Sequence, residues 1–192
     1  MIPVKSTEEQ RDSYTHAIID MWHSATRDQA RRGRMWYPEA HEFAAEIAAG
    51  NTHKGAGVVA ALSANKSWAE NCRLARKAFS EGTASGHFSD AVSKANRIMA
   101  GTDPAEVLPM NIKTGCFYVC IAQPDDPESV VIDRHAHDIA VREAYGQRDR
   151  GLGAIGRYNT LADCYRRAAH HIGELPSVVQ AVTWVAHIER QR

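Results

Sequence analysis

Residues 111–122 read Asn-Ile-Lys-Thr-Gly-Cys-Phe-Tyr-Val-Cys-Ile-Ala, and this stretch decides the fold that we expect. Apart from Lys113 it is apolar on nearly every side, which is typical of a helix near the centre of a domain. Asn is a residue type that often caps helices, so Asn111 is the expected N-cap. The sequence therefore predicts a central helix over residues 112–122.

The sequence on either side has helix signals throughout. Tyr14, Ile18 and Met21 recur at helical spacing behind a capping-box pattern at Ser6 and Glu9. The basic, glycine-interrupted residues 27–34 predict a helix end and a loop, and Pro38 predicts the start of the next helix. We expect eight or nine helices, no strand and no linker long enough to divide domains. The prediction is an all-α fold: a single compact multi-helix domain over residues 1–192.

The composition argues against several classes of protein. Of 192 residues, 44% are hydrophobic and 24% are charged, which is ordinary for a globular chain and unlike a disordered one. Lys+Arg and Asp+Glu are both 23, so no global positive charge indicates a nucleic-acid partner. No apolar run is long enough to cross a bilayer, and the first residues lack a signal-peptide core. We expect a soluble cytoplasmic protein with no membrane partner.

Lys113 is the first residue to which we assign chemistry. It lies in the first turn of an apolar helix, where the helix dipole and low solvation would both disfavour a protonated amine. A lysine that is partly neutral can act as a nucleophile and form a Schiff base. The alternative, which the local pattern favours, is a lysine whose stem packs while its ammonium group reaches solvent.

Asp133 is the second residue to which we assign chemistry. It follows three β-branched residues, 130–132, and precedes a predicted helix that ends near Gly146. The usual role of a carboxylate in this position is that of an N-cap. Because a cap is held in one orientation, it could also stabilise a developing positive charge or act on a water molecule.

Together these segments resemble the helix-hairpin-helix DNA glycosylase superfamily, the endonuclease III-like group. The family's Leu-Pro-Gly-x-Gly-x-Lys-Thr-Ala hairpin is matched by Leu108-Pro109 and Lys113-Thr114-Gly115. Its Val-Asp-x-His motif is matched by Ile132-Asp133-Arg134-His135, and twenty residues separate Lys113 from Asp133.

Two upstream stretches extend the resemblance. Residues 60–65 with Asn71 and Ala75, and residues 94–98, are similar to helices that precede the hairpin in the family. The resemblance covers about residues 55–145, with N- and C-terminal helices expected to pack on that core. It suggests a divergent member of the phage or bacterial type.

The resemblance implies a lysine Schiff-base mechanism of the glycosylase/AP lyase type on DNA. Lys113 would attack the sugar C1′ of a flipped-out nucleotide with a damaged or modified base, and Asp133 would stabilise the positive charge that develops. Asn65 lies where the family places the side chain that fills the gap left by the base. His135 would have a positioning role, and further DNA contacts are expected from Lys66, Asn111 and Thr114.

Other DNA contacts are expected from residue type alone. Trp36 and Tyr37, beside a basic stretch, could stack on bases, with core packing as the alternative. Residues 147–157 interleave glycines with arginines, and we expect Arg150 and Arg157 to contact phosphate. The expected partner is therefore DNA, in a bacterial cell or a phage-infected host, and the expected state is a monomer.

Two alternatives stay open. Met110-Asn111-Ile112 replaces the hairpin glycines of the family, which favours a catalytically inactive DNA-binding relative. His137-Asp138 is the dyad of the HD metal-dependent phosphohydrolases, which are also all-helical. On a helix, however, His135 and His137 point about 200° apart and cannot share one ion.

We therefore expect no metal and no cofactor. The cysteines are too scattered for a zinc ribbon or an iron–sulfur cluster, and the optional cluster of the glycosylase family has no ligands here. Their expected role is that of small buried side chains in a reducing compartment. They are Cys72, Cys116, Cys120 and Cys164.

Overall fold

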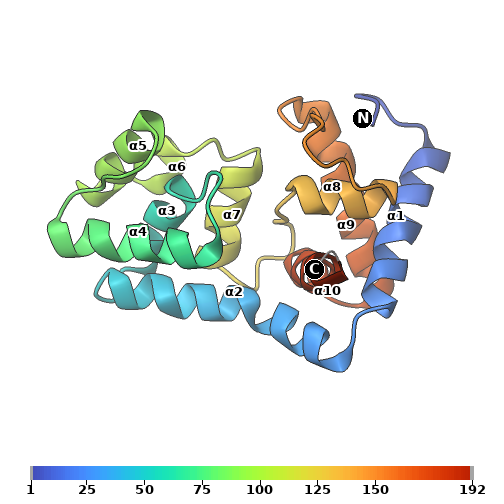
Figure 1. The fold of residues 1–192 in the computed structure, drawn as a ribbon, viewed down its shortest axis with the longest axis horizontal. Coiled ribbons are helices and arrows are strands. Elements are labelled where there is room, and N and C mark those ends of the chain that lie inside the picture. Colours follow the sequence, from blue (N-terminus) through green and yellow to red (C-terminus); the bar gives the residue numbers. More distant parts are fainter. Residues whose placement is uncertain (1, 191–192) are drawn as a thin grey trace. The chain divides into compact units, whose positions relative to one another are not determined.

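The computed structural model describes residues 2–190. Within these residues the chain forms ten α-helices and no strand, so the predicted all-α class is confirmed. None of these helices is both long and apolar enough to span a membrane. In chain order (Figure 1) they are α1 (Glu8–His23), α2 (Arg27–Ile47), α3 (Thr52–Ala61), α4 (Trp68–Glu81), α5 (Ser89–Met99), α6 (Pro104–Val107), α7 (Lys113–Ala122), α8 (Arg134–Val141), α9 (Ile155–Ile172) and α10 (Pro176–Arg190).

The helices are grouped into two compact units. Unit 1 takes the described part of Met1–Tyr37 and Asp125–Arg192, and unit 2 takes Pro38–Pro124. Helix α2 begins in unit 1 and ends in unit 2. Each unit buries apolar side chains of its own, and the expectation of one domain over residues 1–192 stays a prediction.

Unit 1 is built from α1, α8, α9 and α10, which pack on one another, together with the first part of α2. Its largest buried side chains include Ile18 of α1 and Leu161 and Tyr165 of α9. Gly33 of α2 lies directly against α10, because a Cβ at this position would come within 2.5 Å of the Cα of Val182. The two helix backbones therefore approach as closely as a glycine allows.

Helix α3 lies at the centre of unit 2 and packs against α4, α5, α6 and α7. Its residues 55–61 are all buried. Gly55 lies against the backbone of Ala44 in α2, and a Cβ at Gly57 would meet the ring of Pro104 at 2.7 Å. The prediction that residues 112–122 form the central helix is therefore wrong: α7 packs on α3, whose small residues let several helices approach at once.

Helix α2 corrects a second prediction. The loop expected at residues 27–34 is absent, because α2 runs unbroken through Gly33 and Pro38. A capping box starts the helix: the Thr26 hydroxyl accepts the Gln29 N–H at 3.2 Å, and the Gln29 side chain accepts the Thr26 N–H at 2.8 Å. Gly33 serves close packing rather than helix termination, and Pro38 removes only one backbone donor from a well-packed helix.

Two helix starts also differ from the prediction. Asn111 does not cap α7, which begins at Lys113, because residues 109–112 form a turn in which the Ile112 N–H donates to the Pro109 carbonyl at 3.4 Å. Asn159 is of a residue type that often caps helices, and the sequence predicts a helix start there. Helix α9 instead begins at Ile155, four residues earlier, because the preceding loop closes in a turn at Ala154. Arg157 consequently lies in a helix and not in the glycine-rich loop.

Gly115 gives a direct test of the packing at α7. A Cβ at this position would lie 2.6 Å from the Pro109 carbonyl oxygen and against the Met110 backbone. We expect Gly115→Ala to lower the free energy of unfolding by about 1–3 kcal/mol, since backbone atoms cannot move aside cheaply. Urea denaturation measures this change.

The matched control is Gly153→Ala, whose Cβ would enter open space. Its unfolding free energy should stay within about 0.5 kcal/mol of the original chain. Equal stability of the two variants would contradict the close approach at Gly115.

Candidate functional site

The motif around Lys113 folds as a short helix, a turn and a longer helix in unit 2. Val107 and Leu108, at the end of α6, are buried. The turn over residues 109–112 then leads into α7. No side chain caps α7, so its first backbone N–H groups lack a side-chain acceptor. Lys113 itself is exposed. The low solvation expected at its amine is therefore not found, and the alternative of a solvent-reaching ammonium describes it.

Asp133 is the N-cap of α8 in unit 1, as predicted. Its Oδ1 accepts the backbone N–H groups of His135 at 2.9 Å and Ala136 at 2.8 Å. The preceding extended residues 130–132 are buried, and the Tyr158 hydroxyl fixes them by donating to the Val130 carbonyl and accepting the Ile132 N–H, both at 3.1 Å. The carboxylate is thus held in one orientation at the start of α8.

Buried and half-buried aromatic rings lie beside the start of α8. The His135 ring is 6.3 Å from the Trp184 ring and 5.5 Å from the His187 ring, and Trp36 is 6.3 Å from Trp184. Burial lowers the pKa of both His135 and His187, which favours their neutral forms. Trp184 and His187 were not predicted as site residues, because nothing in the local sequence of α10 distinguishes them from core positions.

Tyr37 belongs to the core and not to an exposed stacking surface. Its side chain is buried, and its hydroxyl donates to the Gln180 side-chain oxygen at 2.9 Å. Trp36 packs edge-on against it, with ring centroids 4.9 Å apart. The core alternative therefore describes Tyr37, and Trp36 keeps a partly exposed ring.

Asp138 of α8 lies at the centre of a buried polar network, which the sequence did not predict. Arg150 makes a bidentate pair with Asp138, at 2.8 Å from Nε to Oδ1 and 2.6 Å from Nη2 to Oδ2. Asp138 also lies 2.9 Å from His137 Nδ1 and accepts the Tyr145 N–H at 3.1 Å. These contacts hold the pKa of Asp138 below its usual value, although burial opposes the shift. Arg150, expected to contact phosphate, instead ties the glycine-rich loop to α8.

The environments of the histidines bear on the metal-dependent alternative. His135 faces Trp184 and His187, whereas His137 is fully buried against Tyr145 and Asp138. Within residues 2–190, no group of three His, Cys, Asp or Glu side chains is arranged to hold a metal ion. The positions of these side chains therefore do not support the alternative of an HD metal-dependent phosphohydrolase.

The remaining predicted residues occupy three places. In unit 2, Asn65 is exposed with a left-handed φ of 56° in the turn between α3 and α4, and the Lys66 N–H donates to the Ser63 carbonyl at 3.3 Å. Asn111 and Thr114 flank Lys113. In unit 1, Arg157 donates from Nε to the Ile2 carbonyl at 2.7 Å, so it fastens the N-terminal segment rather than facing a phosphate.

The expected site residues are therefore divided between the two units. Unit 2 carries the exposed Lys113 with its neighbours, and unit 1 carries Asp133 with His135 and Trp36. Comparison with protein families shows that the chain belongs to a family of unknown function, DUF7178, whose model matches residues 1–192. No curated protein and no solved structure matches the chain.

The buried histidines of unit 1 predict an acid-sensitive fold. Burial lowers the pKa of His135, His137 and His187 below 6.5, while the unfolded chain titrates near that value. Below about pH 6.5 the unfolded state thus binds more protons than the folded state, so stability falls as the pH drops through this range. Asp138 adds nothing to this fall, because its lowered pKa keeps it ionised until far lower pH.

Urea denaturation at pH 7.5, 6.5 and 5.5 measures the effect. His137→Gln should reduce the loss of stability between pH 6.5 and 5.5, because it removes a group surrounded by Asp138, Arg150 and Tyr145. His170→Gln, at an exposed position, should leave the pH dependence unchanged. Identical pH profiles for His137→Gln and the original chain would refute the assignment.

Proposed function

We propose that this chain acts on DNA as a glycosylase of the helix-hairpin-helix type, with Lys113 as the nucleophile and Asp133 as its electrostatic partner. The observation that carries the proposal is the fold of the Lys113 motif. A short helix, a tight turn and a second helix follow one another there, and the second helix begins with an exposed lysine. An exposed amine at this position can reach a DNA sugar that is presented from solvent.

The chemistry assigned to Lys113 is nucleophilic substitution at the sugar. After the Lys113 ammonium has lost a proton to solvent, the amine attacks C1′ and the bond from C1′ to the base breaks. The base leaves with the electron pair and takes up the proton that the attacking nitrogen releases. Opening of the sugar ring then converts the adduct to an imine, which permits strand cleavage. Asp133 stabilises the positive charge that develops on the sugar.

The environment of Asp133 supports this role. Two backbone N–H groups fix Oδ1, so the carboxylate needs no reorganisation as charge develops. His135 follows in α8, and burial lowers the pKa of its ring. Because its Nε2 accepts from Arg134 Nε at 3.1 Å, the neutral ring can donate from Nδ1 to a base edge. Trp36 offers a partly exposed ring in the same unit.

The turn that contains Asn65 supports the proposed handling of the extruded base. Asn65 is exposed at the tip between α3 and α4, and its left-handed backbone is one that Asn tolerates better than most residues. A short polar side chain on such a tip suits the filling of the gap left in the duplex. Lys66, next in the chain, would contact the neighbouring phosphate.

A catalytically inactive DNA-binding protein is the second candidate. The observation that favours it is the turn over residues 109–112, which carries Met110 and Asn111 where glycines would let a phosphate approach the backbone closely. Such a protein would bind DNA, as a monomer in the bacterial or phage-infected cell, without forming a covalent adduct.

Borohydride trapping separates the two candidates. The chain is incubated with a duplex that carries an abasic site, and with duplexes that carry a panel of damaged or modified bases. We expect a covalent complex that Lys113→Ala abolishes, because the trapped bond joins the sugar to that amine. Lys77→Ala, which removes an amine paired with Glu81, is the control and should trap normally.

Asp133→Asn tests the partner without removing the helix cap, since Asn is as good an N-cap as Asp. The thermal midpoint of unfolding should stay nearly unchanged, whereas the trapping rate should fall by about a hundredfold. DNA binding with no adduct on any duplex would support the inactive relative. An adduct that persists in Lys113→Ala would refute the assignment of the nucleophile.

A further inference from the structure

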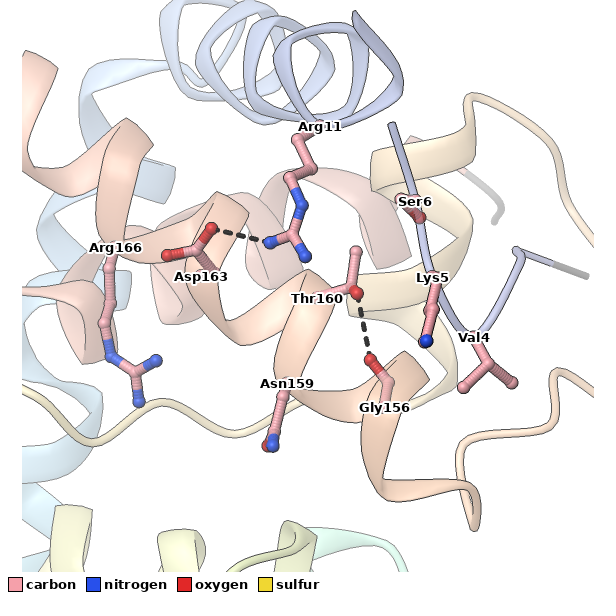
Figure 2. Close-up of a pocket in the computed structure, with 9 residues that line it drawn as sticks. All are labelled: Val4, Lys5, Ser6, Arg11, Gly156, Asn159, Thr160, Asp163 and Arg166. Atoms are coloured by element: carbon pink, nitrogen blue, oxygen red, sulfur yellow. Dashed lines mark hydrogen bonds and ion pairs between the residues drawn. The ribbon is translucent and has the colours of Figure 1, made fainter. Parts of the chain in front are cut away.

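A groove of about 620 Å³ lies in unit 1 beside the first half of α9. Its other walls are the N-terminal segment, residues 4–6, and α1. Figure 2 shows Arg11 from α1 and Lys5 from the N-terminal segment on either side of Thr160 in α9. None of these residues was expected to belong to a site.

The N-terminal segment is fastened onto α9 by specific contacts. Ile2 is buried, and its carbonyl accepts the Arg157 Nε at 2.7 Å. Val4 lies so close to Gly156 that a Cβ there would come within 2.7 Å of the valine side chain and 3.0 Å of its carbonyl oxygen. The segment therefore forms a defined wall of the groove and holds Lys5 and Ser6 in place.

The lining of the groove is cationic although the whole chain is neutral. Lys5, Arg11 and Arg166 line it, against the single carboxylate of Asp163. Asp163 Oδ2 accepts from Arg11 Nη1 at 2.9 Å and lies 3.1 Å from Arg167 Nε, so two arginines already compensate its charge. Arg11 and Arg167 also pair with Glu8, and Arg167 pairs with Asp12, so Lys5 is the lining cation that no carboxylate of the described chain pairs.

The cations differ in how far other groups satisfy them. Arg166 donates from Nε to the Glu128 carbonyl at 2.8 Å and lies 3.2 Å from the Glu128 carboxylate. Arg11 donates from Nη1 to Asp163 at 2.9 Å, and its Nε lies 4.0 Å from the Glu8 carboxylate, so its Nη2 is the group with donors left for a ligand. Lys5 forms no ion pair with any residue of the described chain, so its charge is the one most open to a ligand.

Neutral donors complete the lining. The Ser6 hydroxyl oxygen is buried and finds no hydrogen-bond partner within residues 2–190. Asn159 is exposed on α9, one turn after a helix start that no side chain caps. The positive end of the helix dipole adds to the attraction for an anion here.

We propose that this groove binds a phosphate group, carried by the DNA backbone or by a free nucleotide. Lys5 supplies a point charge, Arg11 a guanidinium, and Ser6 and Asn159 neutral hydrogen bonds to the phosphate oxygens. A phosphate offers several strong acceptor oxygens, which matches this number of donors better than a single carboxylate does. The site is separate from the lysine chemistry proposed at Lys113.

Nuclear magnetic resonance of the ¹⁵N-labelled full chain tests the proposal. Inorganic phosphate, deoxyadenosine monophosphate and a short DNA duplex are titrated separately. We expect amide shifts at Lys5, Ser6, Gly156 and Asn159. Lys5→Gln, which breaks no ion pair of the described chain, should weaken binding about tenfold, since a charge-assisted hydrogen bond contributes roughly that factor.

Two controls make the result specific. Arg31→Gln removes the same charge from an exposed position in unit 1 and should change the affinity by less than about twofold. Lys113→Ala should leave the titration with inorganic phosphate unchanged, so failure of this proposal is distinguishable from failure of the lysine chemistry. Urea denaturation of Lys5→Gln checks that the fold is intact.

Each outcome has a defined meaning. Shifts that saturate at lower phosphate concentration with the duplex assign the groove to the DNA backbone, and the reverse order assigns it to a free nucleotide. Absence of groove shifts with all three probes would overturn the proposal. Equal affinities of Lys5→Gln and the original chain would also overturn it.

Discussion

Close approach of helix backbones is the constraint on which both units depend. Gly33 brings α2 against Val182 of α10 in unit 1, and Gly55 and Gly115 bring backbone against backbone in unit 2. A larger side chain at any of these contacts would push two packed segments apart and leave voids along the rest of their interface. Residues that resemble helix breakers in the sequence therefore act here as packing residues.

A second constraint, specific to unit 1, fixes α8 at both ends. Asp133 caps its start, and the buried Asp138 joins its later turns to Arg150 in the following loop. Because the Asp138 carboxylate is saturated by donors, the network rigidifies the unit instead of leaving a costly unpaired charge. Helix α8 therefore holds two residues in fixed positions: its N-cap Asp133 and His135, which match the glycosylase motif.

The two functional proposals use different residues and different physics. At Lys113, an exposed amine at an uncapped helix start would perform covalent chemistry on a sugar. In the groove beside α9, Lys5 and Arg11 would hold a phosphate electrostatically. A protein that acts on DNA needs phosphate contacts for positioning before it can address a base. In a chain with equal numbers of acidic and basic residues, a lysine that no carboxylate pairs, such as Lys5 in this groove, can meet that need.

The sequence by itself determined the all-α class and the start of α8, which Asp133 caps. These features rest on interactions within about one helical turn, so the local pattern contains them. Only the tertiary structure decided that Gly33 lies inside a helix, that Tyr37 is buried and that Arg150 pairs with Asp138. It also brought Ser6 and Arg11 beside Asn159. Each of these features depends on a contact with a residue that is distant in the chain. The spacing of residues in the local sequence does not predict such a contact.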